Sequence, residues 1–135
     1  MTGESRGKGQ SFEDLRMFVE ARALTNRVYE ITRTPAFAKD FALADQMRRS
    51  SLSIMSNIAE GYELQTDAEF ARFLYIAKAS CGELRAQTLL ASDQKLLSKL
   101  GFEEIYGACR KISVGIFRLI QYLRKSNKDR QRGGA

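Results

Sequence analysis

The side chains with the clearest capacity for chemistry in this sequence are its bases. Lysine and arginine together number 22 against 16 aspartate and glutamate residues, which gives a formal net charge of +6 and a pI near 9.5. Lysine and arginine neutralise phosphates, so this excess is compatible with nucleic-acid binding, although many basic proteins of this size bind no polyanion. The candidate nucleic-acid-binding residues are Arg48, Arg49, Lys111, Arg118, Arg124, Lys125, Lys128, Arg130 and Arg132. The alternative interpretation of these bases is a solvated helix surface followed by a solubilising tail.

Catalytic chemistry lacks its usual residues in this chain. The sequence contains no histidine, so it offers no histidine general base and no Ser–His or Cys–His nucleophile. It has no glycine-rich phosphate loop, and its two cysteines, Cys81 and Cys109, belong to no CxxC pair. The adjacent acids Glu103 and Glu104 are expected on a solvated helix face. We therefore predict no enzymatic activity, no metal and no cofactor, with a magnesium nuclease built from carboxylates alone left open.

The composition is typical of a soluble globular protein. Hydrophobic residues make up 44% of the chain and charged residues 28%, and no apolar run approaches the ~18 residues that cross a bilayer. The opening segment MTGESRGKGQ lacks the apolar stretch of a signal peptide, so we expect a cytoplasmic protein without a membrane partner. In a reducing compartment Cys81 and Cys109 are expected to be buried thiols, and a disulfide between them is the alternative.

Apolar residues recur at alternating spacings of three and four along most of the chain, as they do on amphipathic helices. The pattern predicts four helices, with the capping motif TDAE at the start of the third and Pro35 after the first. Short connections between them predict an all-α fold, an antiparallel up-down-up-down four-helix bundle. The expected helix ranges are 12–34, 39–61, 66–91 and 98–125. The bundle is expected to span 11–125, between a flexible arm at 1–10 and a flexible basic tail at 126–135.

Several of the predicted helices carry a second apolar stripe beside the one that faces a bundle interior. Examples are Val19 in the first helix, Tyr75 and Ile76 in the third, and Phe117 in the fourth. Apolar residues in excess of what one core requires indicate a subunit interface, so we expect a homo-oligomer. A single broad stripe that faces the core is the alternative.

The segment RRSSLSIMSNIAEGY, in the second predicted helix, joins two arginines to a run of small residues. Ser53 and Asn57 share one helix face, where small side chains allow a neighbouring helix to approach closely. Gly61 suits the carboxyl cap of this helix. Asn57 and Glu60 are expected to be buried and to need partners, and Arg72 of the next helix is the expected partner. We interpret Ser53, Asn57, Glu60, Gly61 and Arg72 as a structural or interface lock rather than an active site.

The sequence resembles the family of the bacterial 23S rRNA intervening-sequence protein in three segments, which are FEDLRMFVEARALTNRVYEITR, LADQMRRSSLSIMSNIAEGYE and DAEFARFLYIAKASCGELRAQ. The resemblance covers about residues 12–123, and SNIAEG followed by EFARFLYIA is its most specific part. It implies an antiparallel four-helix bundle that assembles into a homopentameric ring. The family usually has proline where Met55 stands, so the helix here is expected to run straighter.

The resemblance also implies a function. The accessory variability protein of diversity-generating retroelements is similar in fold to this family, and it is a basic pentameric barrel that binds its reverse transcriptase and nucleic acid. We therefore predict a non-enzymatic, basic homo-oligomer that binds structured nucleic acid, RNA more than DNA, with a reverse transcriptase as a further expected partner. The alternative is a protein-interaction scaffold that uses its charge only for solubility, because a fold does not fix a function.

Overall fold

The structure, a computed structural model, describes residues 11–133 and consists of helices joined by short connections. A 3-10 turn, η1 (Phe12–Asp14), precedes α2 (Arg16–Thr32), and a second one, η2 (Pro35–Lys39), leads into α3 (Phe41–Tyr62). The remaining helices are α4 (Asp67–Asp93) and α5 (Lys99–Gly133). Residues 11–133 contain no strand, which confirms the prediction of an all-α fold. The expected flexible arm, residues 1–10, lies outside the described residues.

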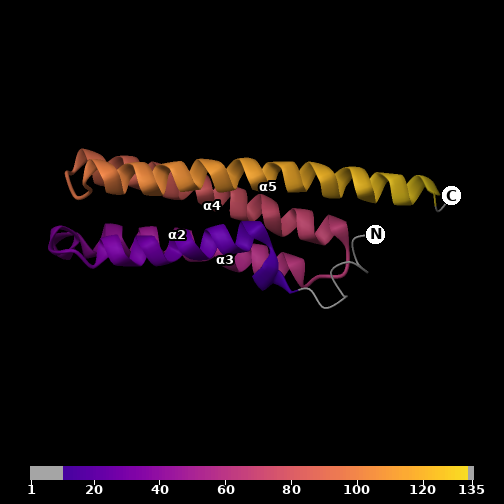
Figure 1. The fold of residues 1–135 in the computed structure, drawn as a ribbon, viewed down its shortest axis with the longest axis horizontal. Helices are drawn as coiled ribbons and strands as arrows, with labels where there is room; N and C mark the ends of the chain where they lie inside the picture. Colours follow the sequence, from indigo (N-terminus) through magenta and orange to yellow (C-terminus); the bar gives the residue numbers. More distant parts are fainter. Residues whose placement is uncertain (1–10, 134–135) are drawn as a thin grey trace.

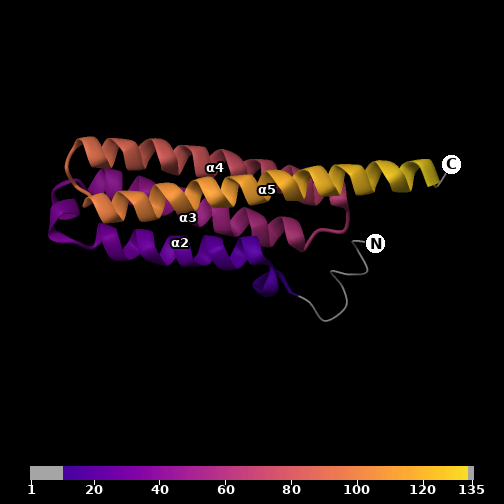
Figure 2. The ribbon, with the colours of Figure 1, turned by 45° about the horizontal axis from the view of Figure 1, so that its top comes forward.

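The four long helices lie side by side (Figure 1). The connections from α2 to α3 and from α4 to α5 lie at one end of the molecule, and the connection from α3 to α4 lies at the other (Figure 1). α4 contacts α3 and α5 most extensively, whereas α2 makes smaller contacts with the same two helices. The α2–α3 face is therefore opposite the α4–α5 face, and the last turns of α5 extend beyond the other helices (Figure 2).

The apolar residues that recur at spacings of three and four meet in one core between the four helices. The largest side chains at its centre, each with less than 2% of its surface exposed, include Met47, Ile54, Ile58, Leu74, Leu84, Ile105, Ile112 and Ile116. Their burial removes apolar surface from water, which is the main favourable contribution to folding. No helix among residues 11–133 is both long enough and apolar enough to span a bilayer.

Cys81 and Cys109 lie in this core as free, buried thiols, in agreement with the prediction. Burial is the largest cause of the raised pKa of each thiol, which reaches about 12 for both. Both thiols are therefore protonated at neutral pH, and a protonated thiol is a poor nucleophile. They act as small apolar side chains of the core.

Side-chain caps mark the starts of two helices close to where the sequence predicted them. The Thr66 Oγ1 atom accepts a hydrogen bond of 3.1 Å from the Glu69 amide, which confirms Thr66 as the cap of α4. The Asp40 carboxylate accepts a hydrogen bond of 3.0 Å from the Leu43 amide at the start of α3. Each cap satisfies one of the amides that lack a partner in the first turn of a helix.

Two predicted boundaries were wrong. α2 begins at Arg16 rather than near residue 12, because residues 12–14 form the separate turn η1. α5 continues through Gly133, so the part of the expected tail from residue 126 to residue 133 is helical. Lysine, arginine and glutamine have high helix propensity. The bases Arg130 and Arg132 in the last turn also interact favourably with the negative end of the helix dipole.

Candidate nucleic-acid interface

A hollow with a volume of about 730 Å³ lies between the first turns of α4 and the last turns of α5. Four bases line it, Arg72 from α4 and Arg124, Lys125 and Lys128 from α5. We call these four residues, with the space that they border, the basic hollow. The other side chains that line it are Asp67, Ala68, Ala71, Tyr75, Gln121, Leu123 and Asn127.

The α5 residues from Gln121 to Lys128 form one wall of the basic hollow. Lys128 follows Arg124 by four residues and Lys125 by three, so neighbouring positions on the helix surface present the three bases together. The Arg124 Nη1 atom donates a hydrogen bond of 3.0 Å to the Tyr75 hydroxyl, which ties this wall to α4. On the α4 side, the Arg72 guanidinium lies 4.8 Å from the centroid of the Phe73 ring, a favourable cation–π distance.

An ion pair joins the last turn of α5 to the start of α4. The Arg130 Nη2 atom lies 2.5 Å from the Asp67 Oδ2 atom; the Asp67 side chain has no exposed surface, whereas 43% of the Arg130 side chain is exposed. Asp67 is the first residue of α4, where the positive end of the helix dipole also favours a carboxylate. Asp67, the one carboxylate among residues 11–133 that lines the basic hollow, is therefore already paired.

Among the side chains that the structure describes, none of the four bases of the hollow forms an ion pair with an acid. The positive pole of the α4 dipole lies at the same place. A concave surface lined by cations focuses positive potential, so this region is suited to attract a polyanion. Within residues 11–133, no group of three or more Cys, Asp or Glu side chains is arranged to hold a metal ion.

The nine predicted bases fall into two groups in the structure. Arg124, Lys125 and Lys128 line the basic hollow, and Arg130 and Arg132 follow them on the same helix. The other four, Arg48, Arg49, Lys111 and Arg118, lie elsewhere. The chain therefore presents a terminal group of bases rather than one surface with all nine.

Three of the four other bases have partners inside the chain. Arg49 pairs with Asp45 at 2.9 Å, and this hydrogen bond raises the pKa of Arg49 above its ordinary value. Lys111 of α5 lies 3.5 Å from the Glu20 carboxylate of α2. Arg48 donates a hydrogen bond of 2.8 Å to the Thr32 hydroxyl. Arg118 is exposed and lines a smaller groove, of about 370 Å³, between α4 and α5.

Arg72 is the base whose environment sequence reasoning missed. It was expected to pair with a buried Glu60, but Glu60 is exposed and the structure contains no ion pair between the two side chains. The reason is that Glu60 lies on the solvent side of α3 while Arg72 faces the end of α5. The sequence could have indicated this environment. In the predicted antiparallel bundle the start of the third helix, which contains Arg72, lies beside the basic end of the fourth.

The small residues of the predicted lock contact α4. The Ser53 and Ser80 hydroxyl oxygens lie 2.8 Å apart, and the Asn57 Nδ2 atom donates a hydrogen bond of 2.8 Å to the Ser53 carbonyl. Asn57 is half-buried and its partner is in its own helix. These contacts are those of two closely packed helices.

Gly61 serves close packing rather than a helix cap. It lies inside α3, which continues to Tyr62, and the residue that ends the helix, Glu63, has an ordinary φ of −77°. A Cβ atom at Gly61 would lie 2.8 Å from the Cβ of Phe73 and 3.0 Å from Cδ1 of Phe70. Only glycine allows α3 and α4 to approach each other so closely at this point.

The fold and the basic hollow define the class to which this chain belongs, a basic all-α protein of four long helices. The chain is a member of the 23S rRNA-intervening sequence protein family, which matches residues 13–118 and confirms the resemblance. A crystal structure of a protein of unknown function from the S23 ribosomal protein family, from Bacteroides thetaiotaomicron, is similar in fold. Its TM-score is 0.71 at 22% sequence identity, over 77% of this chain and 97% of that one. No curated protein matches the sequence.

The family match ends before the bases of the hollow that lie on α5. Arg124, Lys125 and Lys128 follow residue 118, the last matched residue, whereas Arg72 lies within the match. The α5 wall of the basic hollow is thus described by the structure of this chain and not by the family match.

Proposed function

We propose that the protein is a non-enzymatic nucleic-acid-binding protein that holds structured RNA through the basic hollow. The observation that carries this proposal is the gathering of four bases around one hollow whose single lining carboxylate is already paired. The name of the family refers to an intervening sequence in 23S rRNA, which supports RNA as the class of nucleic acid.

Phosphate binding at the basic hollow requires no rearrangement of ion pairs. Lys125 and Lys128 pair with no described acid, so a phosphate does not have to displace a carboxylate from them. Each base that contacts a phosphate releases condensed counterions, and log K then falls with log salt by about 0.7 to 0.9 per contact. Four contacts in each chain correspond to a slope of about −2.8 to −3.6.

We further propose that the antiparallel bundle assembles with copies of itself, as the homopentamer that the resemblance implies. Large apolar side chains of α4 and α5 remain exposed in the single chain, with 42% of Ile76, 48% of Leu90 and 45% of Phe117 in contact with solvent. A second copy that covered them would remove apolar surface from water. Assembly would also repeat the basic hollow and so strengthen the binding of a polyanion. A reverse transcriptase as partner stays a prediction from the resemblance.

The test is a binding titration followed by fluorescence anisotropy across a salt series. A labelled structured RNA and a DNA duplex of equal length are titrated with the wild-type protein and with the variant Lys125→Gln/Lys128→Gln. We expect tighter binding of RNA than of DNA. In the variant, the magnitude of the salt slope should fall by about 1.4 to 1.8 and the affinity near 100 mM salt should fall at least about ten-fold. Size-exclusion chromatography with light scattering on the same samples gives the oligomeric state.

The matched control is Arg49→Gln/Lys111→Gln, which also removes two bases, but two that are paired with Asp45 and Glu20. This control should leave the salt slope unchanged. An equal loss in both variants would show that affinity follows total charge, and the basic hollow would then not be the site. No binding of either nucleic acid at ~50 mM salt by an intact oligomer would refute the proposal and favour the protein-interaction scaffold.

A further inference from the structure

A different hollow lies between α2 and α3, with a volume of about 570 Å³. Two bases line it: Arg22 lies in α2 before Tyr29, and Arg33 directly follows the last residue of that helix. The other lining residues are Thr25, Asn26, Tyr29, Glu30, Leu52 and Met55. We call this site, together with the neighbouring Arg48, the tyrosine cluster.

Two guanidinium groups lie over the Tyr29 ring in this cluster. The Arg48 guanidinium carbon is 4.8 Å from the ring centroid and that of Arg33 is 5.8 Å from it. Arg48 is also fixed by the hydrogen bond that its Nε donates to the Thr32 hydroxyl. A guanidinium that rests on an aromatic face keeps N–H donors free in its own plane, and such donors match the oxygens of a phosphate.

The charge of the tyrosine cluster is positive. Among the side chains that the structure describes, Arg22, Arg33 and Arg48 form no ion pair with an acid. Glu30, the one described acid that lines this hollow, lies 3.6 Å from the Arg27 guanidinium and is already paired. The same two features define the basic hollow, namely unpaired bases around a concavity and a carboxylate that is occupied by another base.

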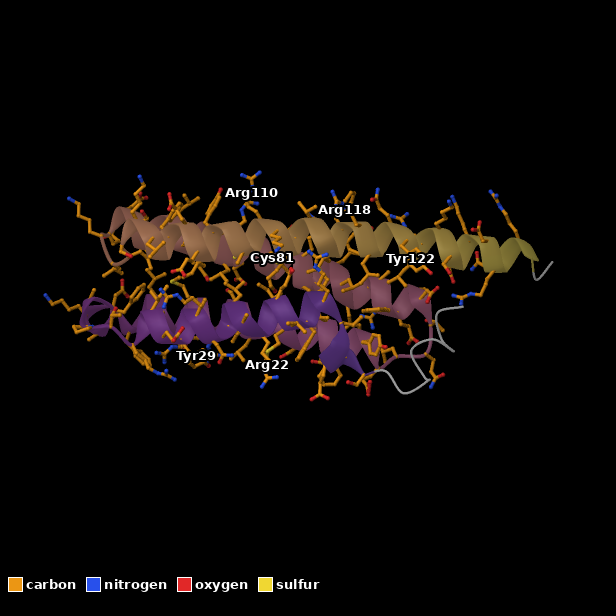
Figure 3. The ribbon with its side chains drawn as sticks, viewed as in Figure 1. Arg22, Tyr29, Cys81, Arg110, Arg118 and Tyr122 are labelled. Carbon is orange, nitrogen blue, oxygen red and sulfur yellow. The ribbon has the colours of Figure 1, made fainter. Side chains whose placement is uncertain are left out.

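The tyrosine cluster and the basic hollow lie on opposite faces of the molecule. α2 and α4 each contact both α3 and α5, so the α2–α3 face and the α4–α5 face point away from each other. In Figure 3, Arg22 and Tyr29 lie on the side of the molecule opposite to Arg110 and Arg118. One stiff segment of nucleic acid that runs along the basic hollow does not therefore reach the tyrosine cluster of the same chain.

We infer that the tyrosine cluster is a second phosphate-binding site, which takes the backbone of a separate nucleic-acid segment. This inference rests on the proposed function, because it assigns the same class of ligand to a second face. Its consequence is that the protein holds two segments at once and brings them together. Bridging of two RNAs is an activity that the basic hollow of one chain does not provide alone.

The test is an energy-transfer assay with two RNA hairpins that cannot pair with each other, one with a donor dye and one with an acceptor dye. The wild-type protein is expected to bring them together and to produce energy transfer. The variant Arg22→Gln/Arg33→Gln is expected to lose most of the transfer, since hairpins on the basic hollows of different copies account only for the remainder. Its affinity for a single hairpin by anisotropy should stay within about three-fold of wild type, because the basic hollow is intact. Lys39→Gln/Lys99→Gln removes two exposed bases outside both sites and is the matched control, which should keep both signals.

The outcomes separate this inference from the proposed function. A ring that bridges hairpins through several copies of the basic hollow would leave energy transfer unchanged in Arg22→Gln/Arg33→Gln, which would overturn the inference and leave the proposed function standing. A loss of transfer in the Lys39→Gln/Lys99→Gln control as well would also overturn it. Failure of the wild-type protein to bind a single hairpin would refute the proposed function, and the inference with it.

Discussion

Two regions of α5 carry bases, and they differ in what those bases face. In the first half of α5, which packs against α2, Glu104 accepts from Arg27 at 2.7 Å and Lys111 lies 3.5 Å from Glu20. We call these four residues the α2–α5 seam. In the last turns of the same helix, Lys125 and Lys128 border the basic hollow and pair with no described acid. Similar side chains thus hold two helices together in one region and remain available to a ligand in the other.

The comparison shows that the number of bases is a poor guide to a binding surface. A lysine paired with a carboxylate must lose that contact before it neutralises a phosphate, whereas an unpaired lysine loses only its water. The side chains of the Arg27–Glu104 pair are 40% and 41% exposed, and Lys111 of the other pair is 66% exposed, so each pair contributes little to stability. The Asp67–Arg130 pair differs from them because its carboxylate is fully buried.

The largest expected effect concerns the close contact of α3 and α4 at the end of the molecule that carries the basic hollow. Gly61→Ala places a Cβ atom 2.8 Å from the Cβ of Phe73, which is fixed to the backbone and cannot move aside on its own. We expect the free energy of unfolding to fall by about 2 kcal/mol, the usual cost of an overpacked core. Urea denaturation followed by circular dichroism measures this change.

Gly107→Ala is the matched control for that substitution. Gly107 lies in α5, and a Cβ atom there would have no neighbour within 4 Å. Alanine in an open helix position should stabilise the protein by about 0.5 to 1 kcal/mol. Equal effects of the two substitutions would show that the contact of α3 and α4 is less tight than the structure describes.

A smaller effect is expected from the two kinds of ion pair. Asp67→Asn removes the charge of a fully buried carboxylate, breaks its ion pair with Arg130 and weakens the favourable contact with the α4 dipole. We expect it to lower the free energy of unfolding by about 1 to 2 kcal/mol, since the exposed Arg130 can return to water. Thermal and urea unfolding at neutral pH measure the loss.

Glu104→Gln is the corresponding change in the α2–α5 seam. Its partner Arg27 and Glu104 itself have side-chain exposures of 40% and 41%, so we expect a loss of less than about 1 kcal/mol. If Glu104→Gln lowers the free energy of unfolding as much as Asp67→Asn does, the ion pairs of the α2–α5 seam are not weak surface pairs. The two regions of α5 would then not differ in the strength of their ion pairs.

The smallest expected effect comes from releasing a paired base. Glu20 Oε2 accepts from Arg16 at 3.2 Å and lies 3.5 Å from Lys111, so Glu20→Gln leaves Lys111 without its carboxylate. We expect RNA affinity to rise by about two-fold at 50 mM salt and the gain to vanish above about 150 mM, because a distant charge is screened. Anisotropy titrations at the two salt concentrations measure the gain. An increase that persists at high salt would mean that the seam contacts RNA directly, and the division between paired and available bases would fail.

Part of the fold and of the site could be predicted because it depends on local spacing. Apolar residues at intervals of three and four place themselves on one side of a helix, so the four helices, their core residues and the cap at Thr66 could be found from the sequence. The burial of Cys81 and Cys109 follows from the same periodicity. The bases in the last turns of α5 were identified by their type alone, which also selected Arg49 and Lys111, whose partners only the structure shows.

The environment of Arg72, the exposure of Glu60 and the function of Gly61 could not be predicted in the same way. Each depends on which helix lies next to which face, and residues far apart in the chain decide it. The helical extension of α5 is a similar case, because Ser126, Asn127 and the following charges are compatible with a tail. Arg130 in this part of α5 forms an ion pair with Asp67, which lies 63 residues earlier in the chain.

The amino-acid sequence alone establishes that this protein is all-α, that four amphipathic helices share one apolar core, and that its last residues are basic. These properties follow from composition and from periods of a few residues, which act within one helix. The tertiary structure decided which bases are paired with acids and which gather around a hollow. The reason is that Coulomb attraction depends on distance in space, and only the packing of α2, α4 and α5 brings Glu20 to Lys111 and leaves Arg72 beside Lys125 and Lys128 without a free acid.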